Sequence, residues 1–229
     1  MKKILMLMTT LGVSLVGIAQ KSETRQLDNF TSLEVGEAIE VIITQGDKNE
    51  AVIEVDDIDL DEVVTEVRGS ELNIERDNRG YRNTNNRGEV VIRLTYKKIE
   101  EISVNSAGSV YSKNVIKAEE FELNASSAGR IELELDVQDL EVDASSAGSI
   151  EVSGTCSSLD LDVSSAGQFE GYDLMCSTIK ADVSSGGSGE VSVKDRLEVD
   201  AGTGGSLYYK GDPDKVLADS NLGGRISKR

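Results

Sequence analysis

The chain has 229 residues, a net charge of −18 and no histidine. The lack of histidine excludes Ser-His-Asp and Cys-His nucleophile pairs, the HExxH zinc motif and a histidine general base. The excess of acidic residues argues against a nucleic-acid partner, because contacts with phosphates need Lys and Arg. The composition therefore favours a protein that is not an enzyme.

Residues 1–19 have the pattern of a secretory signal peptide. Two lysines precede an apolar run from Ile4 to Ile18, and the small residues Gly17 and Ala19 precede a predicted cut before Gln20. A buried N-terminal helix is the alternative. The run is shorter than the ~20 residues of a membrane span. We therefore expect an exported mature chain without a transmembrane span, located in the periplasm, at the outer-membrane surface or outside the cell.

Residues 20–100 predict strands and hairpins without a regular repeat. Residues 38–44 and 51–55 predict one strand pair, and residues 71–75 and 89–95 predict another across a long loop. This loop is either a solvated hairpin tip or a basic segment that docks on an acidic surface, such as that of a second copy. Its arginines are Arg76, Arg79, Arg82 and Arg87. No linker divides the mature chain, so residues 20–229 are expected to form one domain.

A short turn motif returns through the C-terminal half of the chain. The sequence Ser-Ser-Ala-Gly occurs at residues 126–129, 145–148 and 164–167, and related copies lie on both sides. Aligned on the last glycine, the copies are 18 to 21 residues apart, which is the length of one coil of a solenoid. The seven anchor glycines are Gly108, Gly129, Gly148, Gly167, Gly187, Gly205 and Gly224.

Apolar and polar residues alternate on both sides of each anchor glycine. This period of two predicts a strand, a tight turn and a second strand in every repeat. A single coil cannot bury its apolar face alone, so the coils must stack and share one core. Residues 101–229 therefore predict an all-β fold, a parallel β-helix (a two-sheet β-solenoid) with coils of about 19 residues.

The repeated turn is interpreted as the corner between the two sheets. Glycine can adopt the positive φ that a corner requires, and Ala and Ser keep stacked corners narrow. The alternative is a serine nucleophile or a phosphate-binding loop. A strand and not a helix follows each turn, which favours the corner.

Acidic residues recur at fixed offsets from the anchors, at positions that point outward. Stacked coils place equivalent residues about 4.8 Å apart, and facing like charges are destabilising. One interpretation is a solvated face that discourages aggregation; the other is that Ca²⁺ or a cationic partner relieves the repulsion. The candidate calcium ligands are Asp143, Asp162, Asp182, Asp200 and Asp219, and no other cofactor is expected. A second outward set is Glu132, Glu151, Glu170 and Glu190.

The two cysteines occupy nearly the same place in consecutive coils. Cys156 and Cys176 would then have Cα atoms ~5 Å apart, which a disulfide can span. An exported chain reaches an oxidising compartment where such a bond persists. The alternative is a pair of stacked, reduced and buried thiols. Either role is structural, because a catalytic or metal-thiolate site would need further ligands that the chain does not supply.

The chain resembles the auto-transporter adhesin, head GIN domain, family of bacterial envelope proteins over about residues 25–229. The matching features are the signal peptide, the glycine-centred repeats and a segment from Phe30 to Gly46 with the pattern F-x-x-L-x-V-x-x-x-I-x-V before a Gln-Gly turn. Many members have a proline before the first corner, where this chain has residues 95–99 without one. The resemblance implies a β-helical fold, no recognised catalytic residues and a role in cell adhesion.

Three functions are compatible with these features. The first is a non-enzymatic, adhesin-like module of the cell envelope or surface, which binds a protein or glycan or associates with itself. The second is a polysaccharide-binding or polysaccharide-active β-helix protein, whose catalysis would need a basic residue as proton acceptor. The coils offer few bases, which favours the first function. The third is an envelope-stress sensor domain.

Overall fold

A computed structural model describes residues 21–77 and 88–229. The predicted signal peptide and three arginines of the long loop, Arg79, Arg82 and Arg87, lie outside the described residues. Within these ranges the only helical element is a single 3-10 turn, η1 (Leu60–Glu62). None of the described segments is a helix long and apolar enough to cross a membrane.

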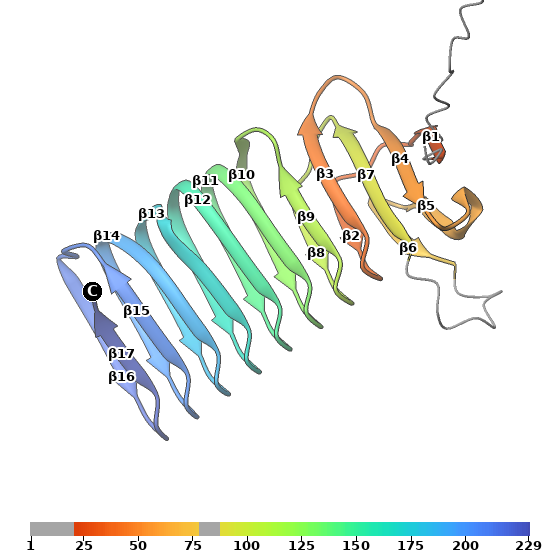
Figure 1. Ribbon diagram of the computed structural model, residues 1–229. Helices are drawn as coiled ribbons and strands as arrows, with labels where there is room; N and C mark the ends of the chain where they lie inside the picture. Colours follow the sequence, from red (N-terminus) through yellow and green to blue (C-terminus); the bar gives the residue numbers. More distant parts are fainter. Residues whose placement is uncertain (1–20, 78–87) are drawn as a thin grey trace, which may run out of the picture.

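The C-terminal half is a parallel β-solenoid (Figure 1), which confirms the predicted fold class. Its long strands each run through one sheet, bend and continue in the other. Neighbours pair in parallel and in register, as from Arg130↔Ser149 to Ala144↔Val163. The strands are β10 (Ile116–Ala125), β11 (Arg130–Ala144), β12 (Ser149–Val163), β13 (Gln168–Val183), β14 (Ser188–Ala201), β15 (Ser206–Lys210), β16 (Lys215–Ser220) and β17 (Arg225–Lys228).

Two sheets make up the walls of the solenoid. Sheet 1 contains the strands that follow a tight turn, such as the first halves of β11 to β14, β15 and β17. Sheet 2 contains the strands that lead into a turn, such as the second halves of β11 to β14 and β16. Every second side chain points inward, because successive residues of a strand alternate between its faces.

The N-terminal region continues the same solenoid, although the sequence predicts only irregular strands there. The strands β2 (Ser32–Val35) and β3 (Glu40–Gln45) form a coil that pairs in parallel with β8 (Glu101–Val104) and β9 (Ser109–Ser112). On its other side lies a coil of β6 (Glu71–Arg76) and β7 (Glu89–Tyr96). The coil of β2 and β3 is therefore flanked on both sides by strands that follow it in the chain.

In each of the two predicted strand pairs of this region, the two strands are not bonded to each other. β7 lies between β3 and β4 (Glu50–Asp56), and it is parallel to β3 and antiparallel to β4. β6 and β7 belong to different sheets, because they pair with β2 and β3 respectively. The strands were predictable from local alternation, whereas their partners lie far away in the chain.

Antiparallel strands close the N-terminal end. In sheet 1, β4 and then β1 (Lys21–Gln26) extend the edge beyond β7. In sheet 2, β5 (Val63–Arg68) pairs with β6. The connection from β4 to β5 buries Ile58 against the core. This end of the solenoid is therefore capped.

The core consists of columns of apolar residues that run along the solenoid. One column of sheet 2 contains Phe121, Leu140, Leu159, Ile179 and Leu197, none of them more than 3% exposed. Burial of such side chains is worth ~1.5–3 kcal/mol each. A coil shares this burial with both of its neighbours, so stacking is the main source of stability.

The corners form tight turns, but the anchor glycine has another role than expected. In the turn at residues 126–129, the Gly129 N–H donates to the Ser126 carbonyl over 2.8 Å. The positive φ angles belong to Ser127 (50°) and Ala128 (62°), not to Gly129. The expectation that the anchor glycine supplies the positive φ is therefore wrong.

The anchor glycines are required by the close approach of the preceding coil. A β-carbon on Gly187 would lie 2.6 Å from the carbonyl oxygen of Val163. A β-carbon on any of the other six anchor glycines would lie 3.0 Å or less from a backbone oxygen. Successive turns are also bonded to each other, as where the Ala147 N–H donates to the Ser165 carbonyl over 3.2 Å. The spacing of the stack thus leaves no room for a side chain at this position.

Candidate functional site

The five candidate aspartates form one column on the outer face of sheet 2. Strand pairing places them in register, each opposite the next: Asp143↔Asp162, Asp162↔Asp182, Asp182↔Asp200 and Asp200↔Asp219. The first four alternate with buried core residues, and Asp219 continues the row in the exposed last coil, so the five carboxylates face outward. We call this row the aspartate column.

The middle of the aspartate column carries electrostatic strain. Partial burial raises the pKa of the Asp162 carboxyl above its ordinary value, and the charges of Asp143, Asp182 and Asp160 raise it further. Lys180 acts in the opposite direction, and its Nζ lies 3.6 Å from an Asp160 oxygen. One lysine thus offsets only part of the repulsion.

The aspartate column is a row rather than a cluster. Within residues 21–77 and 88–229, no group of three or more Asp, Glu, His or Cys side chains gathers closely enough to hold a metal ion. Calcium prefers six to eight oxygen ligands around one centre. The five candidates therefore do not form a coordination cage by themselves.

A second acidic column lies on the outer face of sheet 1. It contains Glu132, Glu151, Glu170 and Glu190 in register. Tyr111 continues the row at one end and Tyr208 at the other. We call the four glutamates the glutamate column. The place of Tyr111 could have been read from the sequence, because it follows its anchor by the same three positions.

The glutamate column lines a shallow groove of about 370 Å³, together with Tyr172 and Asp173. Arg130 reaches Glu151 over 3.3 Å and Glu132 over 3.9 Å. Among the described side chains, Glu170 and Glu190 have no cationic partner within salt-bridge distance. Sheet 2 is also hollowed, over about 570 Å³, next to acidic side chains that include Glu101, Glu122 and Glu141. Both walls thus present negative concave surfaces.

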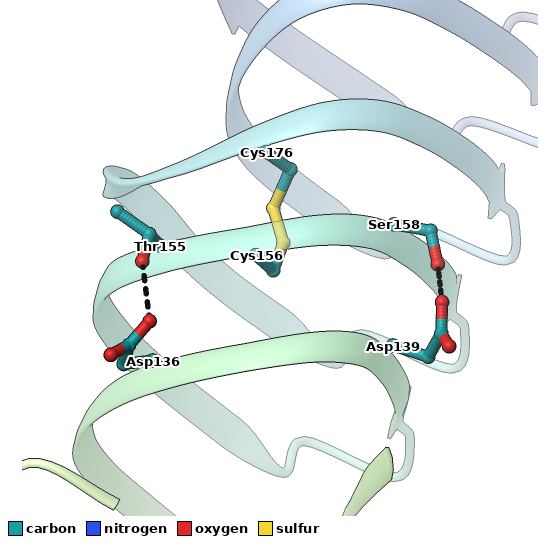
Figure 2. The surroundings of a disulfide bond; sticks show 6 residues. All are labelled: Asp136, Asp139, Thr155, Cys156, Ser158 and Cys176. Atoms are coloured by element: carbon teal, nitrogen blue, oxygen red, sulfur yellow. Dashed lines mark hydrogen bonds between the residues drawn. A yellow bond between two sulfur atoms is a disulfide. The ribbon is translucent and has the colours of Figure 1, made fainter. Parts of the chain in front are cut away.

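A disulfide joins Cys156 and Cys176, whose Cα atoms are 4.6 Å apart (Figure 2). Both residues are buried and lie opposite each other in β12 and β13. The same core column contains Val137 and Val193 in the flanking coils. The bond therefore replaces an aliphatic contact at the bend between the sheets and ties two coils together.

Hydrogen bonds between neighbouring coils flank the disulfide on the outer surface. The Thr155 hydroxyl donates to Asp136 over 3.1 Å, and the Ser158 hydroxyl donates to Asp139 (Figure 2). The neighbouring Lys117 and Thr155 both hold the pKa of the Asp136 carboxyl below its ordinary value. Asp136 and Asp139 thus have hydrogen-bond partners on neighbouring coils, unlike most residues of the aspartate column.

Of the four candidate loop arginines, the structure places only Arg76. Its guanidinium donates to the Gly88 carbonyl over 2.6 Å, and its backbone N–H donates to the Glu37 carboxylate over 2.9 Å. The bond to Gly88 joins the two ends of the long connection, and the bond to Glu37 ties the end of β6 to the turn between β2 and β3. Arg76 is thus partly buried and serves the fold, rather than standing free for a partner.

Comparison with known protein families gives a match over most of the chain. Residues 29–213 match the family model described as "Putative auto-transporter adhesin, head GIN domain". The chain belongs to this family. The match covers the N-terminal coils as well as the regular ones. The resemblance noted from the sequence is thereby confirmed. None of the curated proteins matches the chain.

Solved structures share the fold at low sequence identity. A "putative adhesin" from Bacteroides fragilis is 19% identical with a TM-score of 0.83, and the alignment covers 93% of this chain and 98% of that one. A "putative adhesin" from Parabacteroides distasonis is 18% identical with a TM-score of 0.73, covering 92% and 97%. A "putative lipid binding protein" from the same species is 21% identical with a TM-score of 0.70, covering 92% and 96%. These likenesses show the fold, and the family indicates an adhesin-like surface protein.

Proposed function

We propose that the chain is an exported, non-enzymatic adhesin-like module, which binds a cationic partner through the acidic walls of its solenoid. The observation that carries this proposal is the pair of in-register acidic columns on the two sheets. Facing like charges destabilise a sheet. The pKa of the Asp162 carboxyl is raised first by partial burial and then by the charges of Asp143, Asp182 and Asp160. Stability alone does not favour such an arrangement, whereas a partner with repeated positive charges would relieve the repulsion.

Two further observations support a binding role over catalysis. The sequence contains no histidine, which removes the commonest general base. The walls are shallow and continuous over several coils, which suits an extended partner at an envelope or cell surface better than a small substrate. An envelope protein with a basic segment, or a glycan that carries amino groups, has the required chemistry.

The binding test uses the exported form, from Gln20 onward, and a lysine-rich peptide as probe. Asn in place of Asp143, Asp162 and Asp182 is expected to weaken binding several-fold, because three charges leave the aspartate column. The matched control removes three exposed acids outside both columns, Glu119→Gln, Asp195→Asn and Asp214→Asn. Equal loss in both variants would mean that only net charge matters, and the columns would then not be the site.

Calcium is tested in the same experiment. The titration is repeated in EDTA and then with Ca²⁺, with Mg²⁺ as the control. We expect both ions to weaken peptide binding equally by screening. Tighter binding with Ca²⁺ alone would assign the aspartate column to a cation instead.

Export and surface exposure are tested on cells. Protease added to intact cells is expected to digest the protein, while a cytoplasmic marker survives. Protection in intact cells, with digestion after the outer membrane is opened, would place the module in the periplasm and exclude adhesion to other cells. Cleavage of uronic-acid polymers by the purified protein would contradict the non-enzymatic part of the proposal.

A further inference from the structure

The two ends of the solenoid differ in how they close. At the N-terminal end, antiparallel strands and the buried Ile58 cover the core. At the other end the core columns run into solvent. Val216 continues the column of Leu197, but it is 41% exposed where Leu197 is fully buried. Among the described residues, four large apolar side chains are exposed, and three of them, Val216, Leu217 and Leu222, lie in the last coil.

Each end also presents two strand edges. In the described part of the chain, β16 pairs only with β14, and β17 pairs only with β15. Among residues 21–77 and 88–229, β1 at the N-terminal end pairs only with β4, and β5 only with β6. Sheet 1 therefore ends in β1 and β17, and sheet 2 ends in β5 and β16. Such edges are templates for pairing with another chain.

The ends carry opposite charges. The last coil and its approach are rich in cations on a chain of net charge −18, whereas the loop that caps the N-terminal end is acidic. Two of these residues have exposed partners within the chain, Lys228 with Asp212 and Lys21 with Asp59, and such surface pairs exchange easily. In residues 210–229 the cations Lys210, Lys215, Arg225, Lys228 and Arg229 outnumber the acids Asp212, Asp214 and Asp219. In the N-terminal loop the acids are Asp56, Asp57, Asp59, Asp61 and Glu62, while β1 adds Lys21, Glu23 and Arg25 and β5 adds Glu66 and Arg68, so this end is acidic on balance.

We propose that copies of this chain associate head to tail, with β16 and β17 of one copy pairing with β5 and β1 of the next. Contact between two C-terminal ends would oppose cations, and contact between two N-terminal ends would oppose acids. Only the head-to-tail contact brings ends of opposite net charge together and at the same time covers the exposed Val216. Such a contact is heterologous and does not close on itself, so it generates a linear array.

The test measures the size of the exported form by sedimentation velocity over a range of concentrations. We expect a ladder of dimers and larger species at low salt, which weakens as salt rises. Lys215→Glu with Arg225→Glu reverses the C-terminal end, and Asp56→Lys with Asp61→Lys reverses the other. Each variant alone is expected to associate roughly tenfold more weakly. A chain that carries both reversals restores the opposite charges and is expected to recover association.

The controls separate this contact from its alternatives. Met175 is also exposed, at 46%, but lies on the wall, so Met175→Lys is expected to leave association unchanged. Circular dichroism checks that each variant folds. A parent chain that stays monomeric at all concentrations in low salt overturns the proposal. The proposal is also overturned if the protein forms only dimers and their association changes only when the C-terminal charges are reversed. Such a result would mean that two C-terminal ends contact each other.

Discussion

At the scale of single residues, the neighbouring coil decides what each corner position accepts. In the corner at residues 184–187, Gly186 has a φ of 75° and a β-carbon added to it would meet no atom within 4 Å, whereas a β-carbon on Gly187 would meet the backbone of Val163. Alanine occupies the position of Gly186 in other corners at almost the same φ, as at Ala166 with 63°. Of these two adjacent glycines, Gly186 adopts the positive φ and Gly187 allows the close approach of the neighbouring backbone.

Alanine at these two positions is expected to destabilise the protein to different extents. Gly187→Ala forces a β-carbon to within 2.6 Å of a carbonyl oxygen and should cost about 2–3 kcal/mol or more, as overpacking does. Gly186→Ala meets no atom within 4 Å of the added β-carbon, so it should cost only the strain of alanine at a positive φ, about 1 kcal/mol. Denaturant unfolding of both variants measures the difference. Similar losses in the two variants would mean that backbone conformation, not the close approach, sets the requirement.

The aspartate column gives a prediction that depends on pH. The pKa of Asp162 is raised in the folded state, so its ionised form lowers stability above that pKa and the loss is relieved as the pH falls through it. Asp162→Asn is therefore expected to raise the free energy of unfolding at neutral pH by less than about 1 kcal/mol, because the site is exposed. The gain is measured as a rise in Tm. The gain should shrink as the pH is lowered.

The matched control is Asp160→Asn. Asp160 lies in the same coil but 3.6 Å from Lys180 Nζ, so its removal leaves a lysine without that partner. We expect no gain in Tm for this variant. A gain as large as that of Asp162→Asn, or a gain for Asp162→Asn that does not depend on pH, would contradict the assignment of repulsion to Asp162.

At the scale of secondary-structure elements, the disulfide links two consecutive passes of the chain. Cys156 and Cys176 are 20 residues apart in sequence, and closing a loop of this size stabilises by about 3 kcal/mol in the chain-entropy model. Cys156→Val with Cys176→Val keeps the column apolar, as with Val137 and Val193. This double variant is expected to lower the free energy of unfolding by up to about 3 kcal/mol.

The measurement is thermal unfolding with and without a reducing agent. The parent should lose stability on reduction, and the double valine variant should be insensitive to it. Maleimide labelling of the unfolded, non-reduced protein should find no free thiol. Two labelled thiols per chain in protein taken from the cell envelope would show that the bond does not form there.

The sequence predicts the regular coils well because each one carries its own signal. Anchor glycines and alternating strands recur in every coil, and consecutive coils are also neighbours in space. The columns of acids follow from that register. The coil of β2 and β3 lacks this signal, because Ile39 stands where other turns have glycine. Its partners β6 to β9 are also distant in sequence. Local patterns therefore predicted β3, but neither β2 nor the neighbours of this coil.

At the scale of the whole molecule, the walls and the ends have different chemistry. The walls are acidic and present the two columns, while the ends present strand edges and, with the loop of residues 56–62 included, opposite net charge. If copies join head to tail, the aspartate and glutamate columns of successive copies lie along one array. Repeated weak sites on one array bind a repeated partner more tightly than any site alone. The proposed contact at the ends would therefore strengthen the proposed binding at the walls.

The position of β2 and β3 between later strands constrains the order of folding. A solenoid whose coils stack in chain order can grow one coil at a time. Here the coil of residues 32–45 gains its neighbours only when residues 71–112 have been made and placed on both sides. Contacts so far apart in sequence form slowly. If the chain leaves a membrane pore N-terminus first, the coil of residues 32–45 emerges early but cannot complete its pairing until residues 71–112 have followed. The regular coils that emerge later can therefore assemble before this first coil does.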